Sequence, residues 1–184
     1  MGGKSVKILH ARKQLLVFFM PGFLLGILYV NIFAKQTITE TQIFSAYFLT
    51  QYAMTDVAQR EYLLYLIRVR IVPFVIAVAL TFTKVRKISA AVIVLWTGFS
   101  SGILLSLAVL DMRIKGILFC IIGIFPHFLF YIASYAVILL YSWRYPRNQW
   151  NQQKSVFIVL MMAVGIVLEG YISPKLIKIF LKVL

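Results

Sequence analysis

Long apolar runs alternate with short polar segments along most of the chain. A hydrocarbon core of about 30 Å is crossed by roughly 20 apolar residues in a helix, and five runs reach or nearly reach that length. The five runs cover residues 15–34, 62–83, 89–110, 116–143 and 155–171. Because backbone polar groups in lipid must be hydrogen-bonded within the chain, each run is predicted to be helical. The pattern therefore predicts an all-α bundle of about five transmembrane helices in one integral membrane domain, residues 1–184.

The polar segment between the first two runs has a helical pattern of its own. Thr39 and Gln42 have the spacing of a capping box, and apolar side chains recur at helical spacing after them. This pattern favours an external amphipathic helix that lies on the membrane surface over residues 40–52. Thr55 and Asp56 can then cap the second span.

The ten residues after Pro174 form a second amphipathic segment. Its lysines, Lys175, Lys178 and Lys182, are spaced three and four apart, which places them on one face of a helix. Ten residues are too few to span a membrane. The segment is therefore predicted to be an interfacial helix at the outer surface, with a re-entrant half-helix as the alternative. Pro174 itself is expected to end the fifth span.

The composition is that of a chain whose solvent is lipid. Of the 184 residues, 62% are apolar and only 13% are charged. In a soluble protein the net charge of +14 would indicate a nucleic-acid partner, but here the cations gather at the ends of the apolar runs. Membrane lipids, and no nucleic acid, are the expected partners of these charges. The single cysteine, Cys120, excludes an intrachain disulfide and a cysteine zinc cluster.

The basic residues also predict the orientation of the chain. Residues 4–13, 84–87 and 144–154 hold clusters of Lys and Arg with no acidic residue. With these segments in the cytoplasm, the protein is a multi-pass cell-membrane protein with a cytoplasmic N-terminus and an external C-terminus. The basic start and first run resemble a signal peptide, but the run is too long for one and no cleavage motif follows it. An uncleaved first span is therefore predicted.

Glu169 lies inside the fifth run, although the chain has only five acidic residues. At a rise of 1.5 Å per residue, Glu169, Arg68 and Arg70 all fall about 20 Å above the cytoplasmic face. An intramembrane ion pair of Glu169 with one of these arginines is therefore predicted. Gly170 would let a neighbouring helix approach closely. In the alternative interpretation, the arginines snorkel to the outer headgroups and Glu169 accepts hydrogen bonds near a helix break.

His127 follows Pro126 near the centre of the fourth run, about 17 Å deep by the same helix rise. The proline is expected to kink the helix, and His127 is expected to bond a freed backbone carbonyl. A second histidine is not within reach, and the sequence has no nucleophile elbow or HExxH pattern. The sequence therefore predicts no catalytic residue, no metal site and no cofactor.

Two pairs of glycines are spaced four residues apart, Gly22 with Gly26 and Gly98 with Gly102. Small residues at this spacing let two transmembrane helices approach closely. Internal helix packing is the first interpretation of these faces, and a homodimer surface is the second.

Two stretches, FPHFLFYIASYAV and LEGYISPKL, together resemble the stage II sporulation protein M family. The matching residues are Pro126, His127, Phe130, Glu169, Tyr171 and Pro174. Phe128 and Tyr131 stand where the family typically has a glycine and a glutamate. The resemblance covers about 25 residues and is otherwise supported by chain length and by the number and order of spans.

The resemblance implies a small five-span protein without enzymatic activity. In the sporulation protein, the membrane part anchors peptidoglycan-cleaving partners at the septal membrane, and other family members are encoded beside transporter genes. We therefore expect a non-enzymatic scaffold, in which the Arg68/Arg70–Glu169 region and the external loop present a surface to membrane proteins such as peptidoglycan hydrolases. The alternative is a small permease or an accessory subunit of a membrane transporter. A transporter needs a polar path through the membrane centre, where the sequence offers His127 and Asn31.

Overall fold

The computed structural model describes residues 2–34, 46–54, 59–146 and 149–183, and all regular structure in these ranges is helical. The elements are α1 (Gly2–Tyr29), continued by the π-helix η1 (Val30–Ala34), α3 (Ala46–Met54), α4 (Gln59–Thr81), α5 (Arg86–Met112), α6 (Ile114–Ile124), α7 (His127–Arg144), α8 (Gln152–Tyr171) and α9 (Ser173–Val183). The predicted all-α class is confirmed for the described residues.

Four helical stretches are long and apolar enough to cross a membrane, or five if the bent pair α6 and α7 counts as one span. The four are Gln14–Phe33, Arg60–Thr81, Arg86–Met112 and Gln152–Lys182. Many large apolar side chains are exposed on these helices, as expected for helices solvated by lipid. The chain therefore has the helices of a multi-pass membrane protein.

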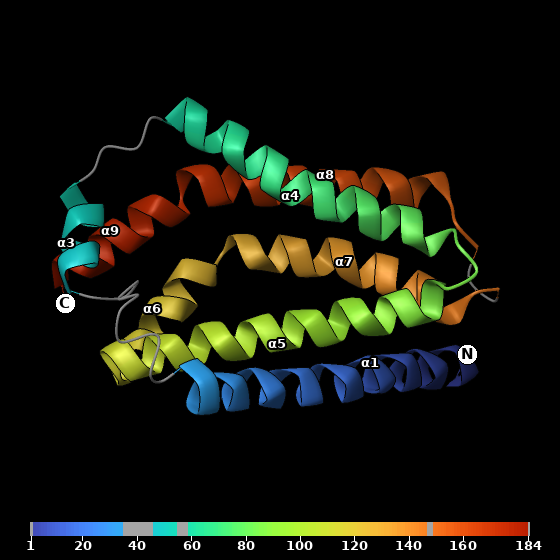
Figure 1. Ribbon diagram of the computed structural model, residues 1–184. Helices are drawn as coiled ribbons and strands as arrows, with labels where there is room; N and C mark the ends of the chain where they lie inside the picture. Colours follow the sequence, from blue (N-terminus) through green and yellow to red (C-terminus); the bar gives the residue numbers. More distant parts are fainter. Residues whose placement is uncertain (1, 35–45, 55–58, 147–148, 184) are drawn as a thin grey trace.

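The long helices lie side by side, and the short ones gather at one end of the bundle (Figure 1). Helix α1 packs along α5, α7 packs against α8, and α4 also contacts α8. The start of α1, the turn between α4 and α5, the end of α7 and the start of α8 lie at the opposite end of the bundle from α3, α6 and α9 (Figure 1). The described parts of the three segments with acid-free basic clusters thus lie at the same end of the bundle.

The contact between α1 and α5 depends on the four glycines. A Cβ atom at Gly22 would overlap the carbonyl oxygen of Leu95, and one at Gly102 would overlap the carbonyl oxygen of Phe23. Gly26 and Gly98 are equally close to the backbone of the opposite helix. These faces therefore meet each other inside one chain, as in the first interpretation, and are not free to form a homodimer surface in this structure.

The fourth run is broken where the sequence predicts a kink. Helix α6 ends at Ile124, α7 begins at His127, and the two axes are bent by 65°. Pro126 has no backbone N–H and its ring clashes with the preceding turn, so it cannot continue α6. The 11 residues of α6 reach only about 16 Å, less than a hydrocarbon core.

The fifth run ends where the sequence predicts, at residue 171, but Pro174 lies at the start of the next helix and does not end this one. Helix α8 ends at Tyr171, and α9 begins two residues later with Pro174 in its first turn. The N–H groups of a first turn have no intrahelical acceptor, so a proline there costs no hydrogen bond. The apolar helical stretch consequently extends past the predicted boundary, to Lys182.

The two predicted amphipathic helices meet each other. Helix α9 packs against α6 and α8, and α3 lies against α9. The described part of the helix predicted over residues 40–52 is Ala46–Met54, whereas Thr39, Gln42, Thr55 and Asp56 lie outside the described residues. Helices α3, α6 and α9 together therefore form one end of the bundle, which we call the α3/α9 end.

Candidate functional site

A buried carboxylate is the centre of the polar contacts in the bundle. Glu169 lies in the last turn of α8 and is only 7% exposed. Its Oε2 atom accepts hydrogen bonds from Arg70 Nε at 2.9 Å and from the Tyr131 hydroxyl at 2.6 Å. Its Oε1 atom accepts a bond from Arg70 Nη2. The guanidinium therefore holds the carboxylate in the two-pronged geometry that is strongest for this pair.

Arg70 reaches Glu169 because it lies on the packed face of α4. Leu66, Phe74 and Ala77 are buried on the same face, at helical spacing from Arg70. Arg68 is two residues away, which turns it about 200° around the helix, and it is exposed. Of the two arginines considered from sequence, Arg70 contacts Glu169 and Arg68 points away from it.

Tyr131 joins the ion pair from α7. Besides its hydrogen bond to Glu169, its ring lies under the Arg70 guanidinium, 5.3 Å from ring centroid to Cζ. The ring also packs over Gly165 of α8, where a Cβ atom would collide with it. Sequence reasoning noted Tyr131 only as a departure from a family pattern. The signal that could have identified it is its position four residues after His127, on the same helical face.

His127 bonds a side chain and not the backbone carbonyl expected from sequence. Its Nδ1 atom lies 2.7 Å from the Ser173 hydroxyl, and its Nε2 atom lies 4.0 Å from Glu169 Oε1. The expectation was wrong because His127 is the first residue of α7, where the Ser173 hydroxyl at the start of α9 lies within hydrogen-bond distance of its ring. Ser173 follows Glu169 by four residues and is itself buried.

These five residues, Arg70, His127, Tyr131, Glu169 and Ser173, are called the polar cluster below. It lies at the two places where long helices are interrupted, since His127 begins α7 and Ser173 begins α9. In the described part of the chain, every buried side-chain nitrogen or oxygen has a hydrogen-bond partner. The cluster thus supplies hydrogen bonds to the buried Glu169 carboxylate and joins α4, α7, α8 and α9.

The remaining residues singled out from sequence have other surroundings. Phe130 and Pro174 are half-buried, and Tyr171 is exposed. A Cβ atom at Gly170 would overlap the Leu63 side chain of α4, which is the close helix approach expected there. Within the described residues, no three His, Cys, Asp or Glu side chains are grouped so that they could hold a metal ion.

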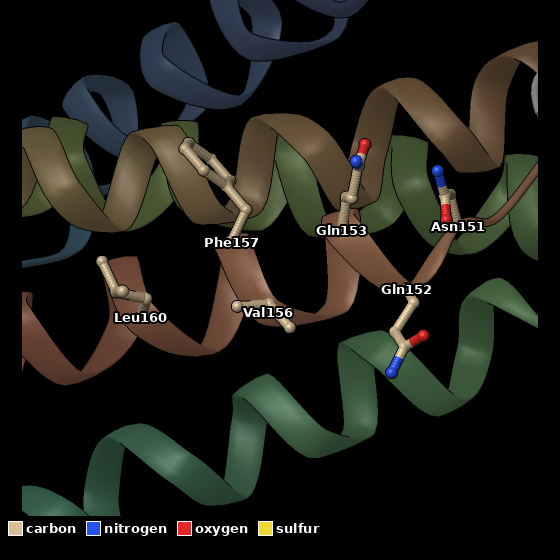
Figure 2. A pocket seen from close by; sticks show the side chains of 6 residues that line it. All are labelled: Asn151, Gln152, Gln153, Val156, Phe157 and Leu160. Carbon is tan, nitrogen blue, oxygen red and sulfur yellow. The ribbon is translucent and has the colours of Figure 1, made fainter.

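An open groove of about 610 Å³ lies on α8, away from the polar cluster. Figure 2 shows the amide side chains of its lining at the start of α8 and the apolar ones one to two turns further along. The lining residues are Asn151, Gln152, Gln153, Val156, Phe157 and Leu160. Leu160 is nine residues before Glu169, about 14 Å along the helix, so the groove and the cluster are separate features.

The stretches FPHFLFYIASYAV and LEGYISPKL meet in space. His127 Nε2 lies 4.0 Å from Glu169 Oε1, and the Tyr131 hydroxyl donates a hydrogen bond to Glu169 Oε2. Comparisons with protein-family models, curated proteins and solved structures give no match to this chain.

Proposed function

We propose that the chain is a non-enzymatic scaffold of the cell membrane that holds partner membrane proteins at its α3/α9 end. The observation that carries this proposal is the pair of contacts from Ser173 to His127 and from Glu169 to Arg70. These contacts fasten the junction of α8 and α9 to α7 and α4. A buried ion pair contributes little net stability but can enforce one arrangement of its helices. The cluster would therefore keep α9 in a fixed position for a partner.

The exposed residues of α9 support docking of a partner at the α3/α9 end. On α9, Lys175 and Lys182 are exposed, and Ile179 is 61% exposed between them in the sequence. Exposed apolar residues flanked by charge are typical of interaction surfaces. The resemblance to the stage II sporulation protein M family supports a partner that remodels peptidoglycan, which requires this end to be external.

The proposed scaffold function predicts that a photo-reactive residue at position 179 will cross-link to one discrete membrane protein in cells. The matched control is the same residue at position 156, because Val156 is 60% exposed and lies at the other end of α8. Position 156 should yield only lipid adducts. Equal protein adducts at both positions, or none at position 179, would contradict the proposal.

The proposed orientation places the α3/α9 end outside the cell. With Cys120 replaced by Ser, a cysteine at Lys182 should react with an impermeant maleimide in intact cells. A cysteine at Lys87, in the acid-free segment at the opposite end, should react only after the membrane is permeabilised. The reverse pattern of labelling would show that the orientation is inverted.

A transport component is the second candidate, and the helix interruptions favour it. Transporter sites are often built where discontinuous helices leave polar groups near the membrane centre, and the polar cluster lies at two such interruptions. A transporter that uses this cluster would carry protons or solute across liposomes and lose that flux in Glu169→Gln. A scaffold would show no flux with or without the substitution, so the two functions are separable.

A further inference from the structure

Arg68 is a cation on the exposed face of α4 that has no partner among the described residues. Leu66 and Phe74 of α4 are buried, and Arg68 lies on the other side of the helix, where it is exposed. It forms no hydrogen bond or ion pair with another described residue, unlike Arg70, which is bound to Glu169. A charged group at this position in a span is costly unless something outside the bundle neutralises it.

The surroundings of Arg68 match a phospholipid. Leu64 and Tyr65, one turn before it, are 60% and 62% exposed. Ile71, Val72 and Val75 continue the exposed apolar face one to two turns further into the membrane. A phospholipid supplies both a phosphate for the guanidinium and acyl chains for this apolar face.

The guanidinium can reach the level of the phosphates. Arg68 follows Tyr62, the start of the apolar run, by six residues or about 9 Å. Helical side chains lean toward the N-terminal end of their helix, which carries the guanidinium of Arg68 back toward that boundary. A planar guanidinium binds phosphate oxygens through two parallel N–H donors.

The charge on this face favours an anionic lipid. Arg60 and Glu61 at the start of α4 are adjacent and of opposite sign, so Arg68 supplies the net charge of the face. A zwitterionic headgroup has its own cation, which competes with arginine for the phosphate. A second copy of the chain is a poor occupant, because a symmetric contact through this face would place Arg68 against its own copy.

We propose that the exposed face of α4 around Arg68 is a binding site for an anionic phospholipid, with the phosphate held by Arg68 and an acyl chain along Ile71 and Val75. This site is independent of the polar cluster, because Arg68 and Arg70 lie on different sides of α4. Lipid binding at this site is a role for Arg68 that is separate from the proposed scaffold function.

The test is native mass spectrometry of the purified full-length protein with added phosphatidylglycerol or phosphatidylcholine of identical acyl chains. The wild type should retain phosphatidylglycerol preferentially, and Arg68→Leu should lower its affinity about tenfold, as expected for loss of a charge-assisted contact. Arg68→Lys should keep part of the preference. Lys87→Leu, which removes an exposed cation at the other end of the bundle, should keep all of it.

Two results would overturn the proposal. An unchanged lipid preference in Arg68→Leu, or an equal loss in Lys87→Leu, would mean that the lipid responds only to overall charge. A photo-reactive residue at position 64 that cross-links to a protein in cells, with no lipid adduct, would assign this face to a protein partner. Circular dichroism checks that the Arg68→Leu variant is folded. If that variant is not folded, the lipid preference of Arg68→Lys tests the site instead.

Discussion

Replacing Arg70 by Met should lower the free energy of unfolding by about 3–5 kcal/mol, because this change leaves the buried Glu169 carboxylate without its partner. Replacing Glu169 by Gln should cost less, because the Arg70 side chain that loses its partner is 40% exposed. The variant with both replacements should lose much less. The measurement is a double-mutant cycle in detergent or lipid, in which unfolding free energies of the wild type, the two single variants and the double variant are compared. Glu169 is 7% exposed and accepts two bonds from Arg70, so the coupling should be large.

Arg68→Met is the matched control for this cycle. Arg68 is also an arginine of α4, but it is exposed and has no contact with Glu169. Its replacement should change the unfolding free energy by no more than about 0.5 kcal/mol, the usual range for an exposed position. A coupling near zero between Arg70 and Glu169, or an equal coupling between Arg68 and Glu169, would refute this account of the polar cluster.

A second large effect is expected where α1 meets α5. Gly102→Ala should destabilise the bundle by about 1–3 kcal/mol, since the new methyl group would meet the carbonyl oxygen of Phe23. Backbone atoms cannot rotate out of the way as a side chain can, so the two helices must separate. Thermal or denaturant unfolding of the purified protein measures the change.

Gly123→Ala controls for the helix propensity of alanine. Gly123 is also helical, but the nearest atom to an added Cβ is the Ile177 Cδ1 at 3.8 Å, an ordinary contact distance. Alanine is favoured over glycine inside a helix by up to about 1 kcal/mol, so this variant should be neutral or slightly more stable. If Gly102→Ala is as stable as Gly123→Ala, the α1–α5 contact is looser than described.

Sequence patterns predicted the helices well because apolar length and proline positions act locally. The runs were long enough to identify, and Pro126 marked the interruption of the fourth one. The role predicted for Pro174 was wrong because a proline can follow the end of one helix or lie in the first turn of the next. Only the packing of α9 against α6 and α3 determines which of these two positions Pro174 takes.

The polar cluster was less predictable because its contacts join distant parts of the chain. The rise per residue of a helix predicted that Glu169 lies at the same depth as Arg68 and Arg70. Because α4 is apolar on nearly all sides, no periodic pattern indicated which of the two arginines faces the bundle. His127 and Ser173 are separated by 46 residues, and neither signals the other locally. Only the spacing of four residues between His127 and Tyr131 would have placed a pair of these side chains on one helical face, because Glu169 and Ser173 lie in different helices.

The separation of 99 residues between Arg70 and Glu169 has a consequence for biogenesis. At about 5–20 residues per second, Arg70 leaves the ribosome roughly 5–20 s before its partner does. During that interval the second span carries an uncompensated guanidinium, which a nascent chain must shelter at the translocon or in water. The guanidinium of Arg70 then gains its carboxylate partner only when α8 is made. A chain truncated before α8 would keep α4 without this ion pair.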